Sequence, residues 1–326
     1  MKIASMHRKT MKFNMSHSMR NAGLMLIAGW GVFSLSLEAA PLEISSVWPK
    51  GSTWYQDLEL AASQIPAATQ GRVEVVLQEK SAINKIPELA LYTMPLLFRG
   101  EAELNYVRER LDADLLAKFA ERGMVIWDLE TIGTAHLFSK LPIDSLEGFL
   151  SSRVWVPKDS HDVKYDEVGL KHPVPLDFRL LRDALRNDEI DTFMLTPTAA
   201  LLKRYHTRVA VVSQQPLTFV VAPLSVQKET LANISPEDQA LVKDKMVEAF
   251  KRAARTNREK DVEAMKTFGE RDELKVSDAI DYSQEAWQSW AENVRNRLAN
   301  GKFVPKEMYE KAKNLLAEYR SQHPNG

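Results

Sequence analysis

Strand-like runs alternate with amphipathic helical segments along this chain of 326 residues. Residues 42–47 alternate between apolar and polar side chains, a Pro-Lys-Gly cluster ends the run, and Ser52 or Thr53 is placed to cap a helix. Thr69-Gln70-Gly71 ends that helix, and residues 73–77 return as a strand. Because strand, helix and strand in succession form a βαβ unit, the pattern predicts an α/β fold with a largely parallel sheet.

The alternation continues to about residue 195, and the character of the chain changes at Ser235. Helical spacing predicts a helix over residues 101–120, and apolar runs predict strands at residues 124–127, 153–156 and 190–195, with a helix over 178–185. Ser235-Pro236 is a strong helix start, and we expect one long helix to about residue 268, followed by two more. We interpret the aromatic stripes of these last helices as core.

The first 39 residues have the pattern of a secretory signal peptide. An apolar, uncharged segment at residues 22–37 follows a basic stretch ending at Arg20 and precedes the small residues Ala39 and Ala40. We expect cleavage after Ala39, because Pro41 would make a poor first residue. A membrane anchor is the alternative, but about 20 apolar residues are usually needed to span a bilayer. No later apolar run approaches that length.

The charge balance argues against nucleic acid and anionic lipid as partners. Without residues 1–39, which hold five basic side chains and one acidic, 38 basic and 43 acidic side chains remain, a net charge of −5. A mildly acidic protein offers no basic surface to either partner. The absence of cysteine excludes disulfides and thiolate metal sites.

No catalytic signature is present in the sequence: it has no glycine-rich phosphate loop, no nucleophile elbow and no paired-histidine zinc helix. We therefore expect a protein that is not an enzyme and needs no cofactor. The one group of potential metal ligands comprises His161, Asp162, Asp166, Glu167 and His172. Its spacing matches no metal motif, so a solvated loop is favoured over a metal site. We interpret His206 as a surface histidine rather than as an acid or base.

Arg153 and Trp155 lie two residues apart on a predicted strand and therefore project to one face. Such a pair can clamp an organic anion, with the guanidinium on a carboxylate and the indole against carbon. The alternative is a half-buried strand with Trp155 in the core and Arg153 at its edge, and composition alone favours that alternative.

Several short strings in a fixed order carry a resemblance to a known family. They are SVWPKGS at residues 46–52, TQGRV at 69–73, MPLLFR at 94–99, FSK at 138–140, WVP at 155–157, VPL at 174–176 and HTRV at 206–209. In this order they resemble the solute-binding subunits of TRAP transporters, the tripartite ATP-independent periplasmic uptake systems. The likeness runs over nearly the whole chain after the signal segment.

The resemblance implies a periplasmic binding protein-like fold of two α/β lobes, with a long interlobe helix and C-terminal helices. Residues 40–130 would form the first lobe, completed by part of 210–326, and residues 131–209 the second. Residues 235–268 would be the connecting helix and 280–322 the C-terminal helices. The lobes would close over one small solute, usually an organic acid, and deliver it to the small and large TRAP membrane subunits in the periplasm.

The resemblance also implies a set of ligand-binding residues, namely Trp48, Arg153, Trp155, Phe178 and Thr196. The chain departs from the family at two arginine positions. The arginine that commonly precedes the strand proline by two residues is Trp155 here, and a second arginine is Ala135. Either Arg153 substitutes, or the ligand is less acidic and more apolar and is met by Trp48 and Trp155.

A larger departure lies between Gln78 and Ile83. The family has a loop, a helix and a strand there that build part of the first lobe's cleft wall, whereas this chain has four residues. Losing a central strand would reorder the first sheet and open the cleft on one side. This leaves an alternative function open, that of a receptor-derived interaction or sensory accessory protein without tight ligand binding.

Overall fold

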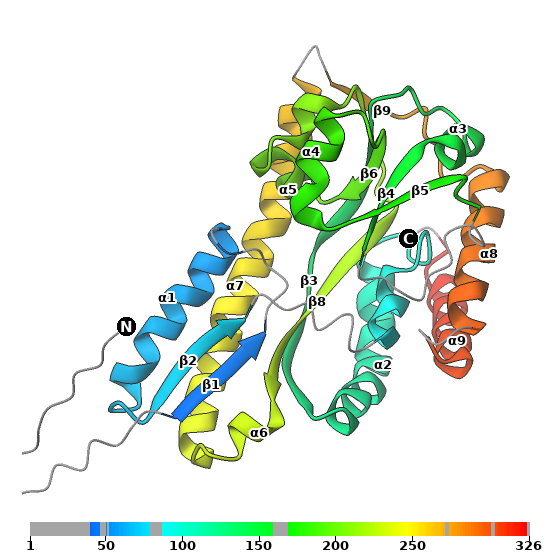
Figure 1. Ribbon diagram of the computed structural model, residues 1–326. Helices are drawn as coiled ribbons and strands as arrows, with labels where there is room; N and C mark the ends of the chain where they lie inside the picture. The colour runs from blue at the N-terminus through cyan, green and yellow to red at the C-terminus, as the bar shows by residue number, and fades with distance from the viewer. Residues whose placement is uncertain are drawn as a thin grey trace, which may run out of the picture. The chain divides into compact units, whose positions relative to one another are not determined.

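One long strand, β3 (Met124–Ser139), connects two sheets in the computed structural model of the chain (Figure 1). The structure describes residues 40–45, 50, 52–78, 87–158, 169–270, 274–300 and 304–324. The first part of β3, up to Ala135, pairs antiparallel with β8 (Thr218–Gln227), and its last four residues pair with β6 (Thr192–Leu195). The prediction of a strand over residues 124–127 was therefore too short, because it missed the crossing into the second sheet.

The first sheet has the order β2-β1-β8-β3. β1 (Ala40–Ser45), α1 (Thr53–Ala68) and β2 (Val73–Gln78) form the predicted βαβ unit, with β1 and β2 parallel and Ser52 as the helix cap. β8 lies directly beside β1, with two residue pairs between them. No described strand lies between β1 and β8. That this order departs from the family's stays a prediction.

The second sheet continues from β3 in the order β6-β4-β5. The strands β4 (Arg153–Pro157) and β5 (His172–Leu176) run parallel, and β7 (Val211–Ser213) pairs with β3 and with β9 (Lys275–Ser277). The helix predicted over residues 178–185 begins as the 3-10 turn η3 (Phe178–Leu180) and continues as α4 (Leu181–Arg186). The short α5 (Pro197–Leu202) follows β6.

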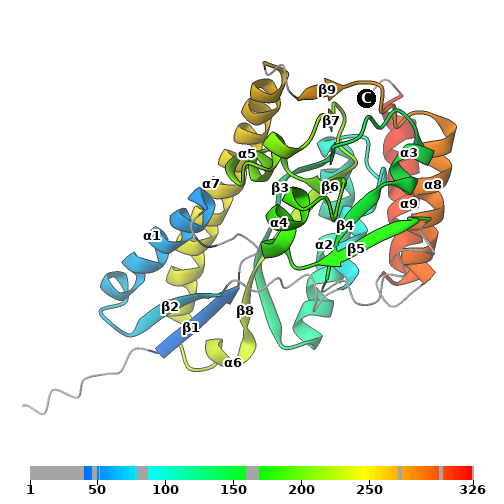
Figure 2. The same cartoon turned by 45° about the horizontal axis from the view of Figure 1, so that its top comes forward.

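Helices cover both faces of the sheets (Figures 1 and 2). The remaining elements are η2 (Pro87–Thr93), α2 (Glu101–Glu121), α3 (Leu146–Ser151), η4 (Tyr205–Arg208), α6 (Lys228–Leu231), α7 (Pro236–Gly269), α8 (Glu285–Asn300) and α9 (Lys306–Gln322). The long helix expected from Ser235 is α7, whose cap Ser235 accepts a hydrogen bond from the Asp238 N–H.

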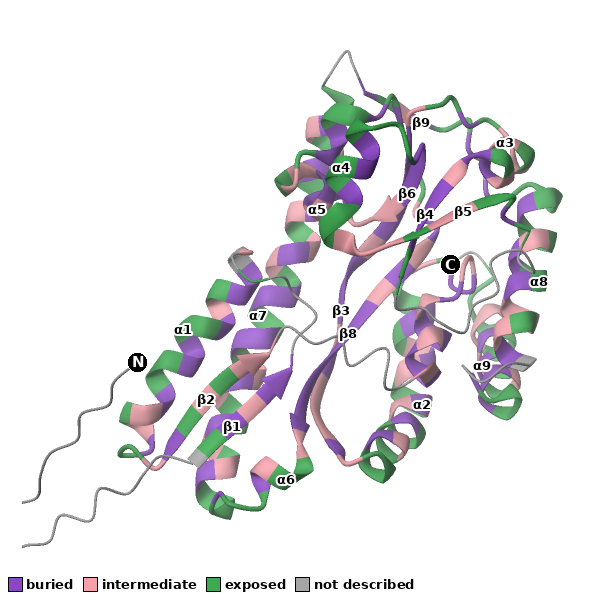
Figure 3. Cartoon of the chain, viewed as in Figure 1, coloured by how far each residue is buried: buried purple, intermediate pink, exposed green. Residues whose placement is uncertain are grey.

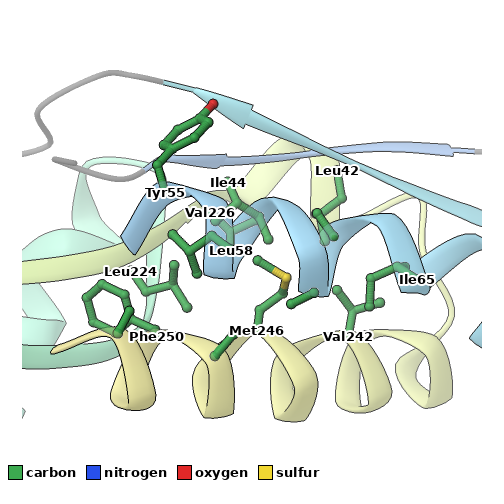
Figure 4. Packing of buried hydrophobic residues seen from close by; sticks show 14 of the residues in the cluster. Leu42, Ile44, Tyr55, Leu58, Ile65, Leu224, Val226, Val242, Met246 and Phe250 are labelled. Atoms are coloured by element: carbon green, nitrogen blue, oxygen red, sulfur yellow. The ribbon is translucent and has the colours of Figure 1, made fainter. Parts of the chain in front are cut away.

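The buried apolar side chains form two clusters for each sheet. Figure 3 marks the buried residues along the strands and helices. Figure 4 shows the cluster in which Val242, Met246 and Phe250 of α7 face α1 and β1. The far end of α7 contributes Ala264 and Phe268 to a cluster of the second sheet. Because α7 is buried against both sheets, the middle of this helix passes the point where β3 crosses between them.

No helix within the described ranges is long and apolar enough to cross a membrane. The proposed signal segment, residues 1–39, lies outside the described residues. The division into lobes at particular residue numbers stays a prediction.

Candidate functional site

A pocket of about 360 Å³ lies where β3 and α7 pass between the two sheets, and we call it the junction pocket. It draws side chains from both halves of the fold. Its lining is Glu101, Thr131, Gly133, Thr134, His136, Pro197, Gln214, Phe219, Arg258, Asp261, Val262 and Met265. The volume lies near the lower end of the range for small-molecule sites, which suits a small solute.

Side chains of α7 bind the backbone of β3 at the wall of this pocket. The pairing of β3 with β8 is irregular between Thr131 and Gly133, as in a β-bulge. Arg258 donates from Nη1 to the Thr131 carbonyl at 2.5 Å, and Asn257 donates from Nδ2 to the Ile132 carbonyl. These bonds fix α7 to the strand that joins the two sheets.

Gly133 allows the close approach of α7 to β3. Its φ is +153°, and a Cβ atom at this position would lie 2.3 Å from Oδ2 of Asp261 and 3.3 Å from Cγ2 of Thr196. No side chain fits in that space, so glycine is required here.

Asp261 is a buried carboxyl group with only one of its oxygens hydrogen-bonded. The residue is 5% exposed, and Oδ1 accepts from the Thr198 N–H at 2.9 Å and from the Thr198 hydroxyl at 2.5 Å. Oδ2 has no hydrogen-bond partner within the described residues. Burial raises the pKa of Asp261 to about 6, although the hydrogen bonds from Thr198 and the proximity of the Thr134 backbone N–H oppose the rise.

This raised pKa predicts that Asp261→Asn stabilises the ligand-free protein at high pH. A group whose folded-state pKa lies above its unfolded value of 3.8 contributes stability that is complete below pH 3.8 and is lost as pH rises through about 6. Asparagine resembles the protonated carboxyl, so the variant should be more stable by about 2–3 kcal/mol at pH 8 and equal near pH 4. Urea unfolding at both pH values measures the difference, and equal stabilities at pH 8 would contradict it.

The other titratable groups of the junction pocket are Arg258 on α7, Glu101 on α2 and His136 on β3. Arg258 Nε lies 3.4 Å from a Glu101 oxygen, and the two side chains are 35% and 49% exposed. His136 Nδ1 lies 2.9 Å from the Ser213 carbonyl oxygen, so Nδ1 carries the proton and Nε2 accepts from the Thr134 hydroxyl at 3.2 Å. Burial lowers the pKa of His136 and keeps the ring neutral. The pocket thus holds one guanidinium and two carboxyl groups.

Arg153 and Trp155 project from β4 as expected but do not line this pocket. Arg153 donates to both oxygens of Asp191, at 2.8 Å and 2.6 Å, and its side chain is 43% exposed. Trp155 is buried and donates from Nε1 to the Leu176 carbonyl at 3.1 Å. Its ring centroid lies 6.0 Å from that of Phe178. This arrangement corresponds to the core alternative that composition favoured.

Thr196 borders the junction pocket through its contact with Gly133. It caps α5 by accepting from the Ala199 N–H at 3.3 Å, and its methyl group borders Gly133. Trp48 lies outside the described residues, and Ala135 is buried on β3. The ligand-binding roles of Trp48, Arg153, Trp155, Phe178 and Thr196 stay predictions.

The structure describes His206 and one member, His172, of the group of possible metal ligands. His206 is buried rather than on the surface, with Nδ1 3.2 Å from the Ala200 carbonyl oxygen, because η4 packs against α5. The expectation of a surface histidine was wrong. Of the possible metal ligands, only His172 is described, and residues 161–167 lie outside the described ranges. The described residues contain no group of three or more potential metal ligands.

Arg258 and Asp261 were missed by the sequence reasoning. The signal was that Asn257 and Asp261 occupy the buried face of α7, three and seven residues after the buried Ala254. Polar residues at apolar positions of a helix are unusual and mark buried hydrogen-bonding sites.

A larger groove, of about 910 Å³, lies between α8, α9 and the segment before α2. Two of its cations bind protein acceptors: Arg320 binds Glu103, and Arg295 donates to the Pro95 carbonyl at 2.8 Å. We take the junction pocket as the better candidate because it lies where β3 passes between the two sheets and is lined by residues from both halves of the fold.

Comparisons with known proteins agree with this fold. The DctP family model, described as bacterial extracellular solute-binding protein, family 7, matches residues 57–302. A search of curated proteins finds no match.

Three solved structures illustrate the likeness. A Bordetella pertussis extracytoplasmic solute receptor binding pyroglutamic acid has 15% identity and a TM-score of 0.72, with 86% of this chain and 100% of that chain covered. A TRAP periplasmic solute-binding protein from Xanthobacter autotrophicus with β-D-galacturonate has 13% identity, a TM-score of 0.70 and coverages of 84% and 98%. One from Sulfurospirillum deleyianum with succinate has 17% identity, a TM-score of 0.69 and coverages of 85% and 99%. At these identities the likeness is one of fold.

Proposed function

The chain belongs to family 7 of the bacterial extracellular solute-binding proteins, and we propose that it captures a small organic acid and delivers it to the membrane subunits of a TRAP transporter. The family is one of receptors rather than enzymes. The observation that carries the proposal is the junction pocket, which is lined from both halves of the fold and contains the guanidinium of Arg258. The ligands of the similar structures, pyroglutamic acid, galacturonate and succinate, all bear a carboxylate.

Arg258 is the cation that we expect to meet the ligand's carboxylate. Arginine binds carboxylates through paired hydrogen bonds, and this arginine takes the place of the family arginines represented here by Trp155 and Ala135. Trp48, Trp155, Phe178 and Thr196 remain proposed as further contacts, whereas Arg153 would have to leave Asp191 to reach a ligand.

A thermal-shift screen of the purified protein against organic acids tests this function. A ligand at 100 times its dissociation constant adds about 2.7 kcal/mol of stability. We expect Arg258→Gln to weaken the binding of any hit by about 10- to 100-fold, because a charged hydrogen bond is lost. Arg252→Gln is the matched control, since Arg252 lies on the same helix and pairs only with the exposed Glu248 within the described residues. Absence of any shift with every acid would exclude the proposal.

We propose a periplasmic location and an export signal at residues 1–39 on the basis of the family and the sequence pattern. Cell fractionation followed by N-terminal sequencing should give a mature protein that begins at Ala40. A full-length chain retained in the cytoplasm would contradict this location.

A further inference from the structure

Asp261 presents a buried acceptor that lacks a donor. Its Oδ2 is shielded from solvent and has no hydrogen-bond partner within the described residues, although the residue lines the junction pocket. Oδ1 of Asn257, one turn earlier on α7, is also buried without a partner among those residues. Both side chains lie against Gly133, where a Cβ atom would be within 3.2 Å of each. Leaving buried acceptors unpaired costs free energy, so the site favours a guest that brings donors.

The charges of the junction pocket also favour a guest that carries hydrogen-bond donors. With Asp261 ionised, two carboxylates, Glu101 and Asp261, face one guanidinium, Arg258. A simple carboxylic acid would add a third negative charge to this pocket. A guest that also carries a positive charge would avoid that repulsion.

Arg258 and Asp261 are spaced to hold two neighbouring charged groups. They lie three residues apart on α7 and both line the junction pocket, and such pairs have Cβ atoms about 5–6 Å apart on one face of a helix. A carboxylate bound at Arg258 and an ammonium bound at Asp261 can therefore belong to one carbon atom. This is the arrangement in an α-amino acid.

Part of the pocket lining is apolar, beside the polar Thr131, Thr134, His136 and Gln214. Val262 is 73% exposed although it lines the pocket, and Met265, Phe219 and Pro197 add apolar surface around it. An exposed valine beside a polar pocket gains by covering the apolar side chain of a guest.

We propose that the junction pocket binds an α-amino acid with an apolar side chain, with its carboxylate on Arg258 and its ammonium on Asp261. This inference rests on the proposed solute-binding function and narrows its ligand class. Asp261 supplies the discrimination between an amino acid and the acid of the same shape that lacks the ammonium group.

Matched ligand pairs test the inference. Thermal shift and calorimetry at pH 7.5 would compare alanine, valine, leucine, methionine and phenylalanine with the corresponding 2-hydroxy acids, in which a hydroxyl replaces the ammonium. We expect at least one amino acid to bind about 10- to 100-fold more tightly than its 2-hydroxy acid. Asp261→Asn should weaken the amino acid by a similar factor, strengthen the binding of the hydroxy acid because one repelling negative charge is removed, and leave the protein folded, since the amide oxygen can still accept from Thr198.

The outcomes separate this inference from the general function. Equal binding of the amino acid and its 2-hydroxy acid, or unchanged discrimination in Asp261→Asn, would overturn the assignment of the ammonium to Asp261. Binding of other organic acids without any amino acid would also overturn it while leaving the receptor function intact. No binding of any compound would remove both.

Discussion

Replacing Gly133 by alanine is expected to destabilise the protein by about 3 kcal/mol and to abolish ligand binding. The new Cβ would lie 2.3 Å from Oδ2 of Asp261, and the φ of +153° is one that residues with a side chain rarely adopt. The overlap is relieved if the Asp261 side chain turns away from Thr198 or if the strand and the helix move apart. The first change breaks the hydrogen bonds between Asp261 and Thr198, and the second breaks the bonds from Arg258 and Asn257 to the β3 backbone.

The effect should exceed that of replacing a glycine in an uncrowded position. Gly148→Ala is the matched control, because Gly148 lies within α3 and its added Cβ would be an ordinary 3.4 Å from the Ser145 hydroxyl oxygen. Alanine in a helix is favoured over glycine by about 0.5–1 kcal/mol, so the control should be slightly more stable than the parent. Urea unfolding measures both variants, and a Gly133→Ala protein as stable as the parent would show that β3 and α7 are not held as close as described.

Local sequence patterns predict the separate helices and strands of this fold better than they predict how β3 meets β8 and α7. The βαβ unit and the helices α2, α7, α8 and α9 are predictable from local periodicity and caps, which short stretches of sequence encode. The stretch of β3 that follows residue 127 contains Asp128, Glu130 and Thr131, and its polar and apolar side chains do not alternate regularly. It is a strand because β8, about 90 residues later in the chain, pairs with it.

The candidate site shows the same limit. The sequence pattern and the family resemblance both predicted Arg153 and Trp155 as ligand-binding residues. The two residues do lie two apart on one strand, β4. Whether such a pair faces a ligand or the protein depends on Asp191 and Leu176, which bind the two side chains in the folded chain. Asp261 lay in a helix whose polar residues look solvated until α5 and β3 are placed beside it.

Arg320→Ala should strongly destabilise the packing of α9 against α2. Arg320 donates to both oxygens of Glu103, at 2.7 Å and 2.8 Å, and to the Leu97 carbonyl at 3.1 Å. Glu103 is 4% exposed, so removing its partner leaves a buried carboxylate with only the Arg99 N–H as a described donor. Losing one partner of a buried pair costs about 3–5 kcal/mol, and the 34% exposure of Arg320 reduces the expected loss to about 2–4 kcal/mol.

A second ion pair across the same two helices provides the control. Lys311 and Asp114 join α9 to α2 at 2.6 Å, but their side chains are 50% and 57% exposed. Lys311→Ala should therefore cost less than about 1 kcal/mol. Equal losses for Arg320→Ala and Lys311→Ala in urea unfolding at pH 7 would mean that burial of Glu103 contributes nothing.

Lowering the pH should reduce the difference in unfolding free energy between the Arg320→Ala variant and the parent protein. Burial alone would raise the pKa of Glu103, but hydrogen bonds from Arg320 and from the backbone of Arg99 outweigh it and lower the pKa below its usual 4.5. A depressed folded-state pKa contributes stability above the unfolded value that is lost as pH falls through the folded value. Without Arg320, burial dominates and Glu103 takes up its proton at a higher pH, which removes the unpaired charge. The destabilisation measured at pH 7 should therefore shrink at pH 4, whereas the small effect of Lys311→Ala, whose partner is exposed, should change far less between the two pH values.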